Sequence, residues 1–224
     1  MSLSFHFVQN NDASTEDLKQ CLLSNLGERK QVIWLVPGGS NIGLSVAVIQ
    51  AIPVELRANL TIMQTDERYG VYDHKDSNWL QLRDAGFDAT GANVITILTP
   101  DNLSLQDTSS RYSQLIEDNF REDTYIIGQF GIGPDGHIAG ILPGTPGTIS
   151  NENVVGYQSD TFTRITLSVK ALLNIDIAFA FVFGESKFEA LNRLSTESLT
   201  TSEQPSQLLK QLPEAHIYQD QINQ

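Results

Sequence analysis

Strand-like and helix-like stretches alternate along this chain, and this alternation constrains its fold more than any other feature of the sequence. Apolar runs of strand length, rich in branched and aromatic residues, occur at 32–36, 60–64, 94–98, 125–130, 164–169 and 177–183. Stretches with the apolar period of a helix lie between several of them, at 42–51, 77–85, 109–120 and 185–194. We therefore predict an α/β fold with a mainly parallel, Rossmann-like sheet and helices on both faces. The tail at 215–224 is predicted to add a short edge strand.

Length and composition predict one domain and exclude a membrane-spanning protein. At 224 residues the chain can bury a full core, so we expect a single domain over 1–224. Its apolar runs are far shorter than the ~20 residues that span a bilayer. The first ten residues lack the pattern of a secretory signal and Cys21 stands alone, which predicts a cytoplasmic protein. The polar segment 195–207 is interpreted as a surface connection.

The charge of the chain narrows the class of partner. The formal net charge is -13 and the 14 lysines and arginines are scattered, which disfavours nucleic acid as a partner. An anionic small molecule needs only a few converging donors, so a local group of cations would suffice. We expect a small-molecule ligand, no membrane partner, and a monomer or small homo-oligomer.

The first of three unusual loops holds Gly38, Gly39 and Ser40, after a buried strand and before a helix. Ligands of such sheets bind beyond the carboxyl ends of the strands, and free N–H groups at a helix start can hold a phosphate. The loop also resembles a nucleotide-binding loop, but Leu44 stands where that loop needs lysine, which excludes an NTPase. A plain glycine turn is the alternative at this position.

The second loop follows the next predicted strand and carries Asp66, Glu67 and Arg68, with Ser77 and Asn78 a little further on. One cation between two carboxylates is often only a solvated, self-paired cluster. Its place at the carboxyl end of a strand favours a functional role instead. Ser77 or Asn78 is also a candidate cap for the helix that follows.

The third loop contains three glycines, Pro134, Asp135 and His137. The glycines match the dinucleotide fingerprint formally, but Pro134 interrupts them and no acidic residue follows at the proper distance. A histidine in such a loop is instead a candidate general base, since its usual pKa of about 6.5 lies near working pH. Asp135 is placed to orient it or to touch a substrate. A histidine satisfied by the backbone is the alternative.

Two later cations complete the candidate set. Arg164 begins a predicted strand and Lys187 opens a predicted helix, so each could pair with a phosphate, although such residues are more often surface charges. We expect no metal and no cofactor, because the possible ligands are isolated along the chain: His6, His74, His137, His216 and Cys21.

These motifs together resemble the family of 6-phosphogluconolactonases and glucosamine-6-phosphate deaminases, and the resemblance extends over most of the chain. The segment 37–40 resembles the phosphate loop of the family, and the segments 66–68 and 77–78 resemble the lactonase signature. The segment 131–137 resembles the active-site loop. The segments 164–167 and 184–187 resemble the later phosphate contacts. The resemblance implies the sugar-phosphate isomerase/deaminase-like fold.

Two positions separate the enzyme types within this resemblance. The deaminase loop has a glutamate where this chain has Leu142, and a tyrosine where it has Arg68, and both differences favour the lactonase. The segment 140–142 departs from the lactonase pattern Ser-Leu-Phe, and Asn41 and Ile42 replace the usual Thr-Pro. These departures bear on the details of the substrate.

The resemblance implies hydrolysis of 6-phospho-D-glucono-1,5-lactone to 6-phosphogluconate, a step of the oxidative pentose phosphate route in carbohydrate metabolism. His137 would activate the water and Arg68 or backbone N–H groups would stabilise the oxyanion. The catalytic candidates are His137, Asp135, Arg68 and Asp66, and the phosphate-binding candidates are Gly38, Gly39, Ser40, Arg164 and Lys187.

Two rival functions remain open at this point. One is a glucosamine-6-phosphate deaminase or isomerase, for which Asp66 and Asp135 would carry protons. The other is a sugar-phosphate-binding protein without turnover. A serine hydrolase is disfavoured, because the chain has no G-x-S-x-G motif.

Overall fold

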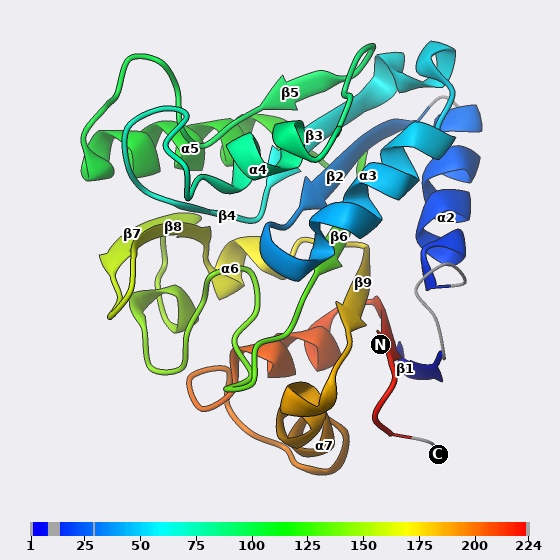
Figure 1. Ribbon diagram of the computed structural model, residues 1–224, viewed down its shortest axis with the longest axis vertical. Helices are drawn as coiled ribbons and strands as arrows, with labels where there is room; N and C mark the ends of the chain where they lie inside the picture. Colours follow the sequence, from blue (N-terminus) through cyan, green and yellow to red (C-terminus); the bar gives the residue numbers. More distant parts are fainter. Residues whose placement is uncertain (1, 9–13, 29, 223–224) are drawn as a thin grey trace.

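A seven-stranded parallel sheet forms the centre of the computed structural model, which describes residues 2–8, 14–28 and 30–222 (Figure 1). In sheet order its strands are β1 (Ser2–Phe7), β10 (Glu214–Gln219), β9 (Ile177–Val182), β6 (Thr124–Phe130), β2 (Gln31–Val36), β3 (Leu60–Gln64) and β5 (Asn93–Ile95). All six pairings in this sheet are parallel. The predicted fold class is confirmed.

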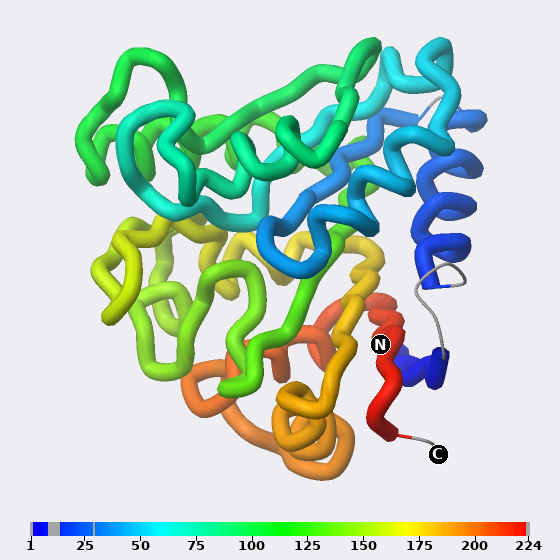
Figure 2. The backbone as a smooth tube through the Cα atoms, in the orientation of Figure 1, coloured from blue at the N-terminus to red at the C-terminus, as the bar shows by residue number. Residues whose placement is uncertain are grey.

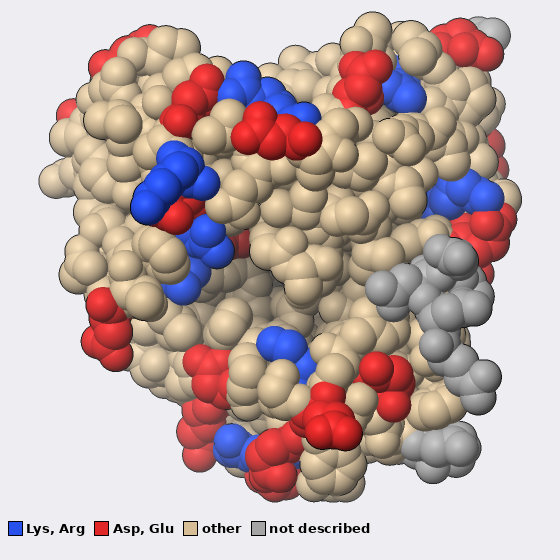
Figure 3. Space-filling model, viewed as in Figure 1, with Lys and Arg blue, Asp and Glu red and all other residues tan. Residues whose placement is uncertain are grey.

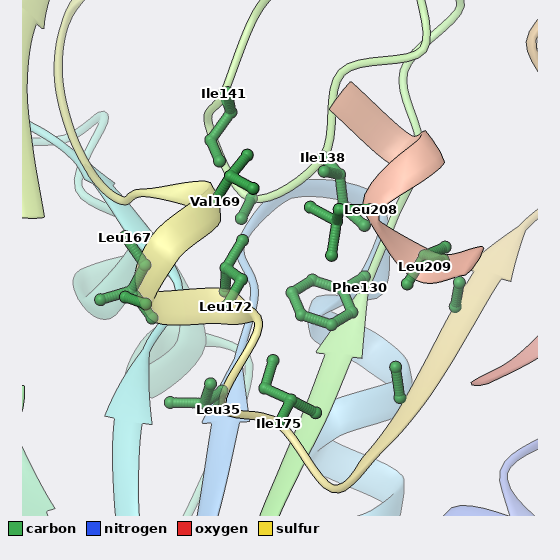
Figure 4. Close-up of a cluster of buried hydrophobic side chains, with 14 of the residues drawn as sticks. Leu35, Phe130, Ile138, Ile141, Leu167, Val169, Leu172, Ile175, Leu208 and Leu209 are labelled. Carbon is green, nitrogen blue, oxygen red and sulfur yellow. The ribbon is translucent and has the colours of Figure 1, made fainter. Parts of the chain in front are cut away.

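Helices cover both faces of this sheet because its strands are apolar on both sides. In β2, Ile33 and Leu35 belong to one buried cluster while Val32, Trp34 and Val36 belong to the other, as the alternation of a strand requires. Buried residues of α2 (Glu16–Gly27), α3 (Ile42–Ala51) and α4 (Asn78–Asp84) complete the second cluster. The first cluster takes in α5 (Leu105–Asn119), α6 (Val169–Leu172) and α7 (Phe188–Thr196), and Figure 4 shows part of it around Phe130.

A second, antiparallel sheet of three strands lies beside the first. Its order is β4 (Asp66–Arg68), β8 (Thr163–Leu167) and β7 (Val154–Gln158). The apolar run at 164–169 therefore forms a strand, but outside the main sheet. This small sheet positions residues that follow β3 against residues from much later in the chain (Figure 1).

The expected edge position of the tail strand is wrong, and the expected surface connection at 195–207 is wrong for its last four residues, since 195–203 are exposed or half-buried. The tail strand β10 lies between β1 and β9, and β1 takes the edge position instead. The segment 204–207 is buried, and the 3₁₀ helix Pro205–Gln211 packs Leu208 and Leu209 into the core. Within the described residues, every helix is too short or too polar to span a membrane.

The order of the strands creates a place for a ligand. The chain passes from β2 to β3 on one side, whereas β6 pairs with the other side of β2. The connections after β2 and β6 therefore diverge, and such a switch point opens a crevice at the carboxyl ends of the strands. Figure 2 shows the backbone leaving β2 and β6 on the same side of the molecule.

Candidate active site

A pocket of about 280 Å³ occupies this switch point. Its lining brings together segments that lie far apart in the sequence: Pro37, Gly38, Gly39, Ser40, Asn41, Asp66, Arg68, Asn78, Gly131, Ile132, Gly133, His137, Ala139, Gly140, Arg164 and Lys187. Every predicted site residue except Asp135 is among them. Figure 3 shows basic side chains around a hollow on this face.

The loop after β2 presents free backbone donors to the pocket. A 3₁₀ turn, Gly39–Asn41, leads directly into α3, and neither helix start is capped by a side chain. Gly39 has φ +65, and a Cβ at Gly38 would lie 2.2 Å from Cγ of Asn78. Glycine is therefore required at both positions, and the uncapped N–H groups form a suitable site for an anion.

Asn41 ties this loop to two other strand ends. Its Nδ2 donates to the carbonyl of Phe181 at 3.3 Å, and a Cβ at Gly131 would lie 2.8 Å from the same nitrogen. Ser45 Oγ donates to the backbone carbonyl of Asn41 at 3.2 Å. The Asn41 side chain is buried, so it fixes the loop relative to β6 and β9.

Glu67 is a buried carboxylate that organises the second loop. Strand alternation places Asp66 and Arg68 on one face of β4 and Glu67 on the other. Glu67 accepts from the backbone N–H groups of Asn78 at 2.6 Å and Trp79 at 3.0 Å, at the start of α4. Three further donors reach it, namely Gln64 Nε2, Ser77 Oγ and the Arg68 N–H. A carboxylate at a helix start is favourable electrostatically as well.

Asp66 lies buried at the pocket with its carboxylate in two hydrogen bonds. Thr65 Oγ1 donates to it at 2.8 Å, and Asn78 Nδ2 reaches its other oxygen at 3.5 Å. Burial raises the pKa of Asp66 to about 6, while Thr65 and the positive charge of Arg164 act in the opposite direction. The carboxyl group can therefore hold or release a proton near neutral pH.

This shift predicts a pH-dependent contribution to stability. Because the folded pKa of about 6 exceeds the ordinary value of 3.8, the folded state holds the proton more tightly. The stability that this bound proton contributes is fully present below pH 4 and is lost as the pH rises to 6. The loss amounts to about 3 kcal/mol, at ~1.4 kcal/mol per pH unit. Urea unfolding from pH 4 to 7 should show wild type losing stability relative to Asp66→Asn. A constant difference between the two proteins would contradict the shift.

His137 is oriented by Asp135. Its Nδ1 lies 2.6 Å from Oδ1 of Asp135, which also accepts from the His137 backbone N–H at 3.1 Å. Partial burial acts to raise the pKa of Asp135, but the hydrogen bonds and charge of His137 outweigh it, so this pKa lies below its usual value. An ionised Asp135 holds the proton on Nδ1, which leaves Nε2 of the neutral ring free to accept a proton.

A tight glycine turn carries this pair. The Gly133 N–H donates to the His137 carbonyl, and the Gly136 N–H donates to the Gly133 carbonyl, each at 2.9 Å. Gly136 has φ +79, and its carbonyl accepts from the Ser206 N–H at 3.0 Å. The segment around Gln204, interpreted from sequence as a surface connection, therefore supports the turn.

Gly133→Ala is expected to lower the kcat of a reaction that uses His137 as its base by about a hundredfold. A Cβ there would lie 2.0 Å from His137 Nδ1 and would displace the ring. Gly27→Ala is the matched control, since its Cβ meets nothing within 4 Å. Steady-state kinetics of both variants check this. Full activity in Gly133→Ala would show that the position of the ring is unimportant.

Three cations border the pocket, and the predicted site residues converge there. Arg68 and Arg164 are paired across β4 and β8, and Lys187 precedes α7 at the end of β9. Burial lowers the pKa of Lys187, and the charge of Asp135 partly offsets that effect. Asp135 contacts His137 but is not part of the lining of this pocket.

Comparison with known proteins identifies the family. The model of the family of glucosamine-6-phosphate isomerases/6-phosphogluconolactonase matches residues 9–218. The chain belongs to this family. Two relatives named 6-phosphogluconolactonase are 26% identical over 181 residues in Rattus norvegicus and 27% identical over 183 in Homo sapiens, each covering 75% of this chain and 70% of the relative.

Solved structures of the same family share the fold. The 6-phosphogluconolactonase of Thermotoga maritima superposes with a TM-score of 0.81 at 17% identity, over 97% of this chain and 99% of that one. That of Shewanella baltica gives 0.81 at 20% identity, over 97% of both chains. A monomeric glucosamine-6-phosphate deaminase gives 0.75 at 18%, over 98% of this chain and 97% of that one. Both enzyme types of the family therefore have this fold.

Sequence patterns identified some residues around this site and missed others or their roles. Tyr157 donates from its hydroxyl to the Gly140 carbonyl at 2.6 Å and so fixes Gly140, which lines the pocket. Glu67 belongs to the predicted signature 66–68, but its role as a buried acceptor at the start of α4 was not predicted. Ser77 is the helix cap, accepting from the Leu80 N–H at 3.2 Å, while Asn78 faces Asp66.

Proposed function

We propose that this chain hydrolyses 6-phospho-D-glucono-1,5-lactone to 6-phosphogluconate, as a carboxylic ester hydrolase of the oxidative pentose phosphate route. The observation that carries the proposal is that His137, which Asp135 orients, lines the same pocket as an uncapped helix start and three cations. The names of the curated relatives support the same activity. A cytoplasmic location stays a prediction from the sequence.

The phosphate of the substrate binds at the α3 side of the pocket in this proposal. Backbone N–H groups of Gly38, Gly39 and Ser40 donate to its oxygens, and Arg164 and Lys187 supply charge-assisted hydrogen bonds. Binding energy from this remote group holds the lactone carbonyl near His137.

The chemistry needs an activated water and a stabilised oxyanion. His137 Nε2 takes a proton from water as the oxygen attacks C1, and Arg68 stabilises the negative charge on the carbonyl oxygen. The bond between C1 and the ring oxygen then breaks, and the ring oxygen takes up a proton to become the C5 hydroxyl. Asp66 is suited to deliver that proton, because its pKa is raised to about 6. The new carboxylic acid ionises in water. His137 then releases its proton to water and Asp66 takes one up, which restores both groups, and the proposed steps use no metal or cofactor.

The buried Asp66 also suits the deaminase of the same family, which makes glucosamine-6-phosphate deamination the second candidate. Leu142 disfavours this candidate, because it replaces the deaminase glutamate with a side chain that cannot transfer protons. It also lies outside the pocket lining.

The two candidates are separated by their products. With freshly generated 6-phosphogluconolactone, titration at constant pH should record acid release faster than spontaneous hydrolysis. With glucosamine 6-phosphate, no ammonia should appear. Ammonia without accelerated acid release would replace the lactonase by the deaminase, and neither product from folded protein would favour a binding protein.

A further inference from the structure

Two arginines face one another across the small sheet. Arg68 of β4 and Arg164 of β8 are direct partners in the antiparallel register, and both line the pocket. Like charges directly opposite one another destabilise a strand pair. The arrangement therefore needs a compensating interaction in the folded protein.

A direct ion pair does not supply that compensation, although Arg164 and the buried Asp66 act on each other electrostatically. The ion pairs within the part of the chain that the structure describes include neither arginine, although the chain has 27 acidic residues. Arg68 Nη1 donates to the Asp76 carbonyl at 3.1 Å, and Arg164 Nε donates to Ser159 Oγ at 3.3 Å. Both guanidinium groups thus keep their positive charge available to a ligand.

Phe162 contacts both guanidinium groups. Its ring centroid lies 4.7 Å from Cζ of Arg68 and 5.7 Å from Cζ of Arg164, within the range of cation–π interactions. The ring is carried by the turn between β7 and β8. Ser159 closes that turn through its backbone N–H and Oγ, which donate to the Phe162 carbonyl at 2.9 and 2.7 Å.

We propose that Phe162 is a positioning residue that holds Arg68 and Arg164 together at the pocket, so that both bind the anionic, phosphorylated substrate. The negative face of the ring attracts both cations and offsets their mutual repulsion. Without the ring, the two long side chains separate toward solvent and lose part of their order. This inference rests on the proposed function, because it assigns the two arginines to the substrate of that reaction.

The test compares variants at one position by their affinity for inorganic phosphate, measured by calorimetry, and by their kinetics with the lactone. Phe162→Leu keeps an apolar side chain but removes the π face, and Phe162→Tyr and Phe162→Trp keep it. The Leu variant should bind phosphate about tenfold more weakly, because Arg164 loses the cation–π contact that holds it at the phosphate. Its kcat/KM should fall at least as much, because Arg68 loses its contact as well. The Tyr and Trp variants should stay within about twofold of wild type.

Phe7→Leu is the matched control, because Phe7 is an exposed phenylalanine on the edge strand β1. It should leave phosphate affinity unchanged. The inference is overturned if Phe162→Leu binds phosphate like wild type, or if the Tyr and Trp variants lose as much affinity as Leu. Should Phe162→Leu not fold, weak phosphate binding by folded Phe162→Trp would still overturn it, and wild-type affinity would support it.

Phosphate affinity does not depend on turnover, so the two proposals can fail separately. A wild-type protein without lactonase activity would remove the proposed function. Unchanged affinity in Phe162→Leu of an active enzyme would remove only the role of Phe162.

Discussion

His137→Ala is expected to lower kcat for lactone hydrolysis by about 10²- to 10⁴-fold, the usual contribution of a positioned general base. KM should change little, because the imidazole acts on water and the phosphate contacts lie elsewhere in the pocket. The fold should also be retained, since the His137 side chain is 35% exposed and its main partner is the partly exposed Asp135. Steady-state kinetics and a thermal melt of the same preparation measure both quantities.

His6→Ala is the matched control for this variant. His6 is a half-buried histidine on β1, at the edge of the sheet remote from the pocket lining, and it contacts His216 and Tyr218. Its removal should leave kcat and KM as they are in wild type. Full activity in folded His137→Ala would contradict the assignment of the base.

Glu67→Ala is expected to lower the free energy of unfolding by about 3 kcal/mol or more. The substitution leaves the buried N–H groups of Asn78 and Trp79, and the Ser77 hydroxyl, without their acceptor, and each unsatisfied buried group costs ~1–3 kcal/mol. It also releases the start of α4, which holds the Asn78 amide against Asp66. Urea unfolding at pH 7 measures the loss.

Glu122→Ala provides the comparison for that measurement, because Glu122 is exposed between α5 and β6. Its effect should remain within about 0.5 kcal/mol, as for ordinary surface substitutions. Equal stabilities for the two variants would mean that Glu67 does not anchor α4.

The fold class was predictable because it depends on periodicity, and the errors arose where pairing over long distances decides. The runs at 32–36 and 60–64 are buried on both faces, which identifies strands of a parallel sheet. No local feature of the sequence of β1 or β10 indicates which of the two strands lies at the edge of the sheet. The run at 164–169 has the composition of any strand, and only its pairing with β4 places β8 in the second sheet.

The candidate site was predictable where function requires an unusual residue in a loop after a strand. Gly38 and His137 belong to such loops, Asp66 begins the short strand β4 just after β3, and the topology brings all three to one pocket. Phe162 and Tyr157 act through contacts with residues distant in the sequence, and an aromatic residue near a turn carries no local signal of that role. Sequence patterns therefore predicted the residues that line the pocket better than the residues that hold them in place.

The most direct test of the central claim compares two lactones that differ only in the phosphate. The rate of acid release above spontaneous hydrolysis is measured for 6-phosphogluconolactone and for unphosphorylated glucono-1,5-lactone with the same wild-type protein. The account predicts a much larger kcat/KM for the phosphorylated lactone, because the loop 38–40 before α3, Arg164 and Lys187 bind its phosphate. Equal values for both lactones, or no excess rate with either from folded protein, would contradict it.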